Sequence, residues 1–376
     1  MKAKEIQYTG RLNWVDAAKG IGILLVLLGH APRDIMRTQY PFIDFLYYFI
    51  YSFHMPLFFF LAGIIFGHLQ IITPSISFFT FLKKKVKTLL VPWVSFSILI
   101  YLVIEGMNYI PTMSKMLQGT FMEELDFGSY IMLCIKGENP YCIHLWYIYS
   151  LFFVQIFVLL IFRIYQKVTK KKVVSFREIR ILVGIAIVIF LFMPSQLPVI
   201  TNVKSYLMYY ALGIYYAFAM MKIKTKFSLW MIGGILCCSA NSLVVNMNGF
   251  NFHTVRIGIY YITVFVGVPM MIALICSFAK KLEKNKWLLW LGRNSFDIYL
   301  LHQPFCCATL GIILLMIFPH QLSFYLLIMG ICTIASVVFP FAIMEIAWRL
   351  HIDSLLKSLF GVKRMKGDSM AKKYNG

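Results

Sequence analysis

The sequence predicts an all-α integral membrane protein with about ten transmembrane helices and both termini in the cytoplasm. Of its 376 residues, 60% are hydrophobic and only 14% are charged, and the mean hydropathy is +0.76. This composition leaves too little polar surface for a water-soluble domain. Apolar runs long enough to cross a hydrocarbon core of ~30 Å recur along almost the whole chain, so we expect them to be membrane spans.

One membrane domain, residues 11–350, is expected to hold all the spans, and a basic cytoplasmic tail, residues 351–376, to follow it. The expected spans are Trp14–His30, Phe42–Phe66, Thr88–Ile104, His144–Phe162, Ile179–Val199, Tyr206–Met221, Phe227–Val245, Ile257–Ala279, Leu288–Ile317 and Leu322–Trp348. The ninth run is so long that its first part, up to Asn294, is expected to lie at the interface before the true span. The first run carries charged residues that a cleavable signal peptide would not tolerate, so it is expected to be retained.

The connections between spans alternate in charge. Basic clusters at 83–87, 163–180, 222–226 and 280–286 predict cytoplasmic loops, whereas the acidic connection from Glu105 to Cys142 predicts an outside loop. The net charge of +21 comes from these short clusters, so we interpret it as an orientation signal and expect no nucleic-acid partner. An even number of spans agrees with both termini inside.

The eight cysteines show no metal-ligand spacing, and no metal is expected. Most of them lie within spans, where they act as small apolar residues. Only Cys134 and Cys142, in a polar loop, could pair in an oxidising compartment, and the sequence leaves that pairing open.

Ionisable residues inside spans are costly, so each is a functional candidate. On a helix, Asp16, Lys19 and His30 share one face, and the eleven-residue step from Lys19 to His30 spans ~16 Å along the axis. A polar stripe therefore runs from the inner end of the first helix to a histidine in the outer half of the membrane. A neutral histidine can remove the proton of a hydroxyl near neutral pH, so His30 is a candidate base.

At these positions the sequence resembles the acyltransferase 3 family of membrane-embedded O-acyltransferases. The matching motifs occur in order: Asp16–Gly20 with Leu28–His30, Phe53–Phe59 with Ala62–Gly63, Lys83–Lys87 before Leu90–Trp93, His144–Tyr147, and Leu291–Ser295 leading to Ile298–His302. The branch resembled most is that of fucose 4-O-acetyltransferase-like proteins. Lys19 stands where much of the family has arginine, which keeps the charge but loses the planar fork.

The resemblance implies acyl-coenzyme A, with acetyl-coenzyme A as the expected donor, entering from the cytoplasm, and a catalytic histidine at His30. Asp16 and Lys19 are assigned to the same catalytic stripe, although an ion pair that only fixes the helix is the alternative. Lys84 and Lys87 match the family's paired basic residues, and with Lys83 and Lys85 they would bind the phosphates of coenzyme A. The alternative for this run is an orientation signal alone.

The expected acceptor is a carbohydrate or lipid-linked glycan at the outer side, and membrane lipids surround the protein. Acceptor-binding candidates are His302, His54, Ser295, Tyr299 and Arg33, with Arg37 beside the last. The expected location is a cell membrane, as a multi-pass protein of a bacterial plasma membrane.

A proton-coupled secondary transporter is the competing prediction, because intramembrane histidine, aspartate and lysine side chains could also form a proton pathway. Repeated halves with matching Gly/Pro-interrupted helices, which are frequent in transporters, are not visible in the sequence. The sugar, the hydroxyl, the acyl chain, an acyl-histidine intermediate and the oligomeric state all stay open.

Overall fold

The computed structural model describes residues 12–69, 77–117, 125–171, 175–193, 198–219, 227–246 and 281–361, with short pieces at 266–267, 270–273 and 277–278. These residues form helices and connections, without a strand among them, as the sequence predicts. The expected span Ile257–Ala279 and the end of the tail, 362–376, lie almost wholly outside the described residues.

The helices of the first half are α1 (Asn13–His30), α2 (Asp34–Gln39), α3 (Pro41–Tyr51), α4 (His54–His68), α5 (Phe78–Lys85), the π-helix η1 (Val86–Leu90), α6 (Val91–Asn108), α7 (Pro111–Leu117), α8 (Phe127–Lys136), the 3₁₀ turn η2 (Ile143–Leu145) and α9 (Trp146–Thr169). Those of the second half are α10 (Phe176–Phe192), α11 (Pro198–Ala219), α12 (Phe227–Asn246), α14 (Lys286–Arg293), α15 (Ser295–Leu301), the π-helix η3 (His302–Leu310), α16 (Gly311–Ile317), α17 (Leu322–Arg349) and α18 (Asp353–Phe360).

Four stretches of the described chain are long and apolar enough to cross a membrane. They are Pro41–His68, Phe78–Asn108, Ile143–Thr169 and Leu322–Arg349, and the bent pair Ser295–Leu301 with Phe305–Ile317 makes a fifth if it is one span. Helix α1 carries Asp16 and Lys19, and α10 has 17 residues, only ~26 Å of helix. The protein is therefore an all-helical, multi-pass membrane protein, and the count of ten and the orientation of the termini stay predictions.

Large apolar side chains remain exposed along the outer helices, which is what contact with lipid requires. On α17 they are Ile334, Val338, Phe341 and Ile346, and on α6 they are Ile98, Leu102 and Val103. Helix α17 passes Pro340 without ending. Apolar faces this extensive are rare on water-soluble monomers, so they support the membrane assignment.

Two of the expected spans are interrupted next to candidate site residues. The second is split at Ser52–Phe53 into α3 and α4, so His54 begins a helix. The ninth is split into α14, α15, η3 and α16, and α14 ends at Arg293, which agrees with an interfacial first part up to Asn294. The third is longer than expected, because α5 and η1 continue into α6.

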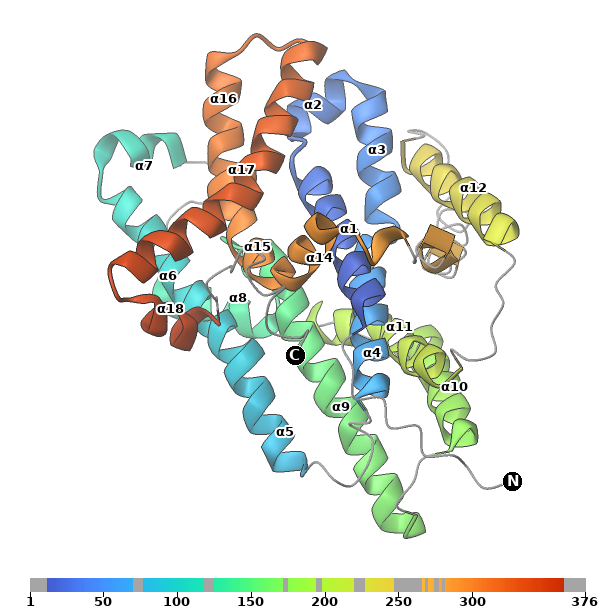
Figure 1. Ribbon diagram of the computed structural model, residues 1–376. Helices are drawn as coiled ribbons and strands as arrows, with labels where there is room; N and C mark the ends of the chain where they lie inside the picture. The colour runs from blue at the N-terminus through green and yellow to red at the C-terminus, as the bar shows by residue number, and fades with distance from the viewer. Residues whose placement is uncertain are drawn as a thin grey trace, which may run out of the picture.

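Helix α1 lies in the middle of the bundle, beside α4, α14 and α15, as Figure 1 shows. Glycines allow the closest approach: a Cβ on Gly292 of α14 would collide with the backbone oxygen of Asp16, and one on Gly20 with that of Leu288. Gly63 of α4 and Gly213 of α11 meet backbone in the same way. Small residues at such crossings let membrane helices pack backbone to backbone.

The start of the segment expected to be a tail is a helix. Helix α18 packs on α6, where the rings of Phe360 and Phe96 lie 6.2 Å apart, and Gly361 adopts a left-handed φ of 68° at its end. The tail's first part is therefore ordered against the membrane domain.

Candidate active site

Four histidines from four separate segments converge beside the end of α1. The ring centroids of His30 and His302 lie 5.3 Å apart, those of His144 and His302 lie 5.2 Å apart, and those of His30 and His54 lie 6.5 Å apart. We call these four residues the histidine cluster. It joins the ends of α1, η2 and α15 with the break between α3 and α4.

Local breaks in the helices place two of these side chains. His54 follows the two-residue interruption at Ser52 and Phe53, and His302 is the first residue of the π-helix η3. Pro304 lies in that π-helix and has no backbone N–H, so a regular α-helical hydrogen bond cannot form there. π-helical turns are frequent at functional sites.

Backbone carbonyls fix the proton of three cluster histidines. Nδ1 of His54 lies 2.9 Å from the oxygen of Ile50, and Nδ1 of His302 lies 2.7 Å from the oxygen of Tyr299. Nε2 of His144 lies 3.4 Å from the oxygen of Leu300. A carbonyl only accepts, so each of these ring nitrogens donates a proton and the other nitrogen keeps a free lone pair.

Two of those lone pairs have no protein partner. Nε2 of His302 and Nδ1 of His144 are buried, and neither makes a hydrogen bond to the described residues. An unpaired buried acceptor costs ~1–3 kcal/mol. A hydroxyl group entering the cluster would satisfy either atom, so the cluster is suited to bind a hydroxyl.

His30 differs from the other three in access and in partner. His302, His54 and His144 are 0%, 2% and 3% exposed, whereas His30 is half-buried. Its Nδ1 lies 2.9 Å from the hydroxyl of Tyr51, and a hydroxyl can donate or accept. His30 is therefore the least buried cluster histidine and the one whose ring proton is not fixed by a carbonyl.

A mostly apolar cavity of about 200 Å³ runs beside α1 toward this cluster. Lys19, Val26, Met55, Tyr147, Ser295 and Tyr299 are among the residues that line it. Val26 lies one turn before His30, and Met55 follows His54, so the cavity reaches from Lys19 to the neighbourhood of the cluster. We call it the Lys19 cavity. It suits a long, thin chain with a polar group near Lys19.

Lys19 belongs to a charge cluster around one buried carboxylate, that of Asp16. The Asp16 carboxylate forms ion pairs with two cations, and Asp16 is only 4% exposed. Its Oδ1 lies 2.9 Å from Nζ of Lys19, and its Oδ2 lies 3.8 Å from Nε of Arg293. Fourteen residues of helix, ~21 Å, separate Asp16 from His30. Asp16 therefore holds the two cations and does not touch the histidines.

The lysine run lies on the continuous helix formed by α5, η1 and α6. Lys83, Lys84 and Lys87 are exposed, and Lys85 is half-buried with Nζ 5.2 Å from the ring centroid of Phe81. The whole stretch Phe78–Asn108 has 31 residues, ~46 Å of helix, more than a ~30 Å core. Leu89, two residues after Lys87, lines the Lys19 cavity, so the helix that carries the run forms part of the cavity wall with its buried face.

The acceptor-binding candidates fall into three groups. His302 and His54 belong to the cluster. Ser295 and Tyr299 line the Lys19 cavity, and the ring of Tyr299 also packs on the cluster, with its centroid 5.4 Å from that of His144 and 5.9 Å from that of His302. The side chain of Arg33 lies beside Gly311. Arg37 is paired with Asp44, with Nε and Oδ1 2.7 Å apart. Burial lowers the pKa of Arg37, but the hydrogen bond to Asp44, together with the electrostatic effects of Asp44, Tyr47 and Tyr48, gives a net rise.

Sequence reasoning missed three residues of this site. His144 received only a possible motif role, although its ring contacts His302. Tyr51 was not noticed, because one tyrosine among many carries no signal. Arg293 stands in the quoted Leu291–Ser295 motif, and its position next to a glycine at a helix crossing could have pointed to it.

Comparison with known proteins gives one match. A family model described as an acyltransferase domain matches residues 12–345, which include the whole cluster and the Lys19 cavity. None of the curated proteins and none of the solved structures compared with this chain matches it.

Proposed function

Since the chain belongs to the acyltransferase family whose model spans residues 12–345, we propose that this membrane acyltransferase moves an acetyl group from acetyl-coenzyme A to a carbohydrate hydroxyl. His30 acts as the general base. The acceptor is a glycan or glycolipid on the outer face of a cell membrane, which we take to be a bacterial plasma membrane.

The accessibility of His30 carries this proposal. His30 is the half-buried member of a cluster whose other rings are buried, and it lies near the end of the Lys19 cavity. When Nδ1 of His30 donates to the hydroxyl of Tyr51, Nε2 is left with a lone pair and can take the proton of an acceptor hydroxyl. The unpaired nitrogens of His302 and His144 can accept hydrogen bonds from neighbouring hydroxyl groups of the same sugar.

The donor side rests on the Lys19 cavity and the lysine run. The bound donor supplies an acyl thioester, the activated group of the reaction. Lys84 and Lys87 are exposed cations suited to phosphates, and the apolar walls of the cavity suit an extended arm that ends in the thioester. Asp16, which also pairs with Arg293, holds Lys19 at the cavity, so we assign Asp16 a positioning role.

Radiolabelled acetyl-coenzyme A and purified protein in lipid nanodiscs test the proposal. Wild-type protein should transfer label to a glycan acceptor, and His30→Ala should bind the donor yet transfer ~10²–10⁴-fold more slowly. His320→Ala, an exposed histidine far along the chain, is the matched control and should keep wild-type transfer. Near-normal transfer by His30→Ala would show that another residue is the general base. Transport of a solute by the purified protein without use of the donor would favour the transporter.

A further inference from the structure

A second hollow lies on the other side of the start of α9. It has a volume of about 480 Å³ and is lined by residues 137–140, Ile143, Trp146 and Asn202. We infer that this hollow, which we call the Trp146 pocket, binds the sugar ring of the acceptor, and that the ring is neutral or carries an amino group. This inference rests on the proposed function.

The wall of the Trp146 pocket is rigidly built. Oδ1 of Asn139 accepts hydrogen bonds from the backbone N–H groups of Tyr141 and Cys142, at 3.2 Å and 2.8 Å. Its Nδ2 donates to Ser97 and to the hydroxyl of Tyr130, at 3.0 Å and 3.2 Å. Asn139 is 4% exposed, so it fixes the loop and leaves recognition to its neighbours.

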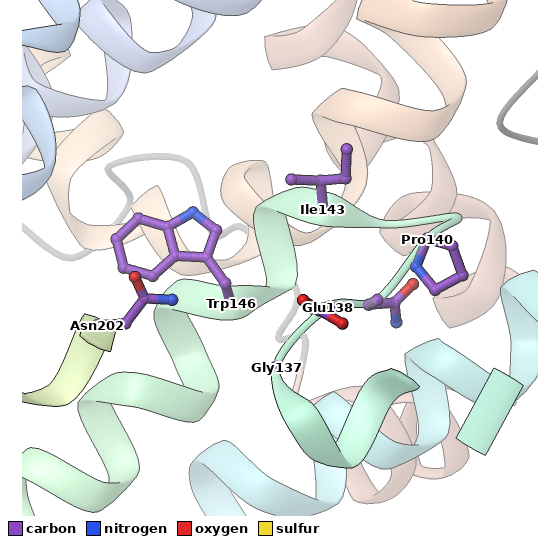
Figure 2. Close-up of a pocket in the computed structure, with 7 residues that line it drawn as sticks. Gly137, Glu138, Pro140, Ile143, Trp146 and Asn202 are labelled. Carbon is purple, nitrogen blue, oxygen red and sulfur yellow. The ribbon is translucent and has the colours of Figure 1, made fainter. Parts of the chain in front are cut away.

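The ring of Trp146 offers a flat platform to this pocket, as Figure 2 shows. It is held from behind by Tyr206, with ring centroids 5.0 Å apart, and by Phe59, with a stacked ring at 6.3 Å. A pyranose presents C–H groups on one face, and the negative face of an aromatic ring attracts their partial positive charge. A fixed, half-buried tryptophan is therefore the side chain expected under a sugar.

Two polar side chains border the platform with free hydrogen-bonding capacity. Figure 2 shows the amide of Asn202 next to the indole and the carboxylate of Glu138 across the hollow. Among the described residues, neither side chain makes a hydrogen bond or ion pair. Glu138 would accept from sugar hydroxyls or an ammonium group and would repel an anionic sugar, which selects the class of acceptor.

The start of α9 links the Trp146 pocket to the histidine cluster along the chain. Trp146 is two residues after His144, and its neighbour Tyr147 lines the Lys19 cavity, so one helix start separates the two spaces. On the other side, Tyr206 behind Trp146 and Tyr51 beside His30 line one small cavity. A sugar on Trp146 and a thioester in the Lys19 cavity would thus approach the cluster from different directions.

Binding and transfer can be measured separately. Saturation-transfer NMR with three methyl glycosides, a glucoside, a glucosaminide and a glucuronide, reports sugar binding by the intact protein without any donor. Wild-type protein should bind the first two and not the glucuronide. Trp146→Ala should abolish binding, Trp146→Phe should keep it in part, and Trp287→Ala, a change at an exposed tryptophan of α14, should leave it unchanged.

Steady-state transfer gives the second readout. Trp146→Ala and Glu138→Gln should each raise the acceptor KM and leave the donor KM unchanged. For Trp146→Ala we expect a rise of at least about tenfold. Glu105→Gln, which also removes one negative charge, is the control for Glu138→Gln. The inference would be overturned if folded Trp146→Phe and Glu138→Gln variants both kept the wild-type acceptor KM. It would also be overturned if the wild-type protein bound the glucuronide as well as the other two glycosides. If glycosides bind through Trp146 but no acetyl is transferred, the proposed function fails and the sugar pocket stands.

Discussion

The hydroxyl of Tyr51 and Nδ1 of His30 lie 2.9 Å apart, and this contact joins the break between α3 and α4 to the end of α1. Among the described residues, it is the one hydrogen bond of a cluster imidazole ring whose partner is a hydroxyl, so His30 can exchange its tautomer without leaving a carbonyl unsatisfied. Tyr51 is itself held by a stacked Tyr47 ring, with centroids 4.1 Å apart.

Tyr51→Phe should lower kcat while leaving the donor KM near its wild-type value. The ring and its stacking on Tyr47 are preserved, but Nδ1 of His30 loses its partner, so fewer His30 rings point Nε2 at the acceptor. We expect a loss of about tenfold, the scale of one hydrogen bond of ~1.4 kcal/mol. Tyr48→Phe on the same helix is the control. Equal kinetics for both variants would show that Tyr51 does not orient His30.

His302→Ala should reduce transfer less than His30→Ala does. His302 is fully buried with its proton fixed by the oxygen of Tyr299, so it is placed to hold a hydroxyl and not to be the accessible base. Pre-steady-state transfer in both variants, with circular dichroism as a check of folding, compares the two residues. A larger loss in a folded His302→Ala protein would assign the base to His302.

Lys84→Ala together with Lys87→Ala should raise the donor KM and weaken its dependence on salt. The two ammonium groups are exposed, so their attraction for phosphates is screened as ionic strength rises. The control is the pair Lys281→Ala and Lys284→Ala, which removes two exposed lysines elsewhere. Donor KM measured from low to high salt decides the question: identical curves for the two double variants would leave the run as an orientation signal.

Gly292→Ala should destabilise the protein and weaken donor binding. The new methyl group would collide with the backbone oxygen of Asp16, and relieving that collision separates α14 from α1 and moves Arg293 off the Asp16 carboxylate. Overpacking of this kind costs ~1–3 kcal/mol. Gly330→Ala meets no atom within 4 Å and should be neutral or slightly stabilising. Thermal unfolding in detergent measures both variants. Equal melting temperatures for Gly292→Ala and Gly330→Ala would contradict the close-packed crossing of α1 and α14.

Thr112→Cys and Val168→Cys should react with a membrane-impermeant maleimide from opposite sides. Both residues are exposed, Thr112 on α7 and Val168 at the end of α9 beside the basic cluster, and Figure 1 places α7 and the end of α9 at opposite ends of the molecule. In intact cells only Thr112→Cys should label, and after lysis both should. The reverse pattern would invert the topology derived from the charged loops.

The sequence alone determined that this protein lies in a membrane and that it resembles acyltransferases. Composition required a bilayer, because no water-soluble fold can cover so much apolar surface. Helical spacing was enough to relate Lys19 to His30, since both lie on one regular helix. Ordered motifs pointed to an acyltransferase, and the family match agrees with that.

Only the tertiary structure decided which residues meet. His144 and His302 are separated by 158 positions, so no local spacing could predict that their rings touch. The break at Ser52–Phe53 and the π-helix at His302 are invisible to hydropathy, because interrupted and regular helices have the same composition. The contact of Arg293 with Asp16 depends on two glycines from distant segments, and the Trp146 pocket depends on α11 lying beside a loop that precedes α9. Packing between segments distant in sequence sets these contacts, whereas hydropathy and helical period report only on neighbours along the chain.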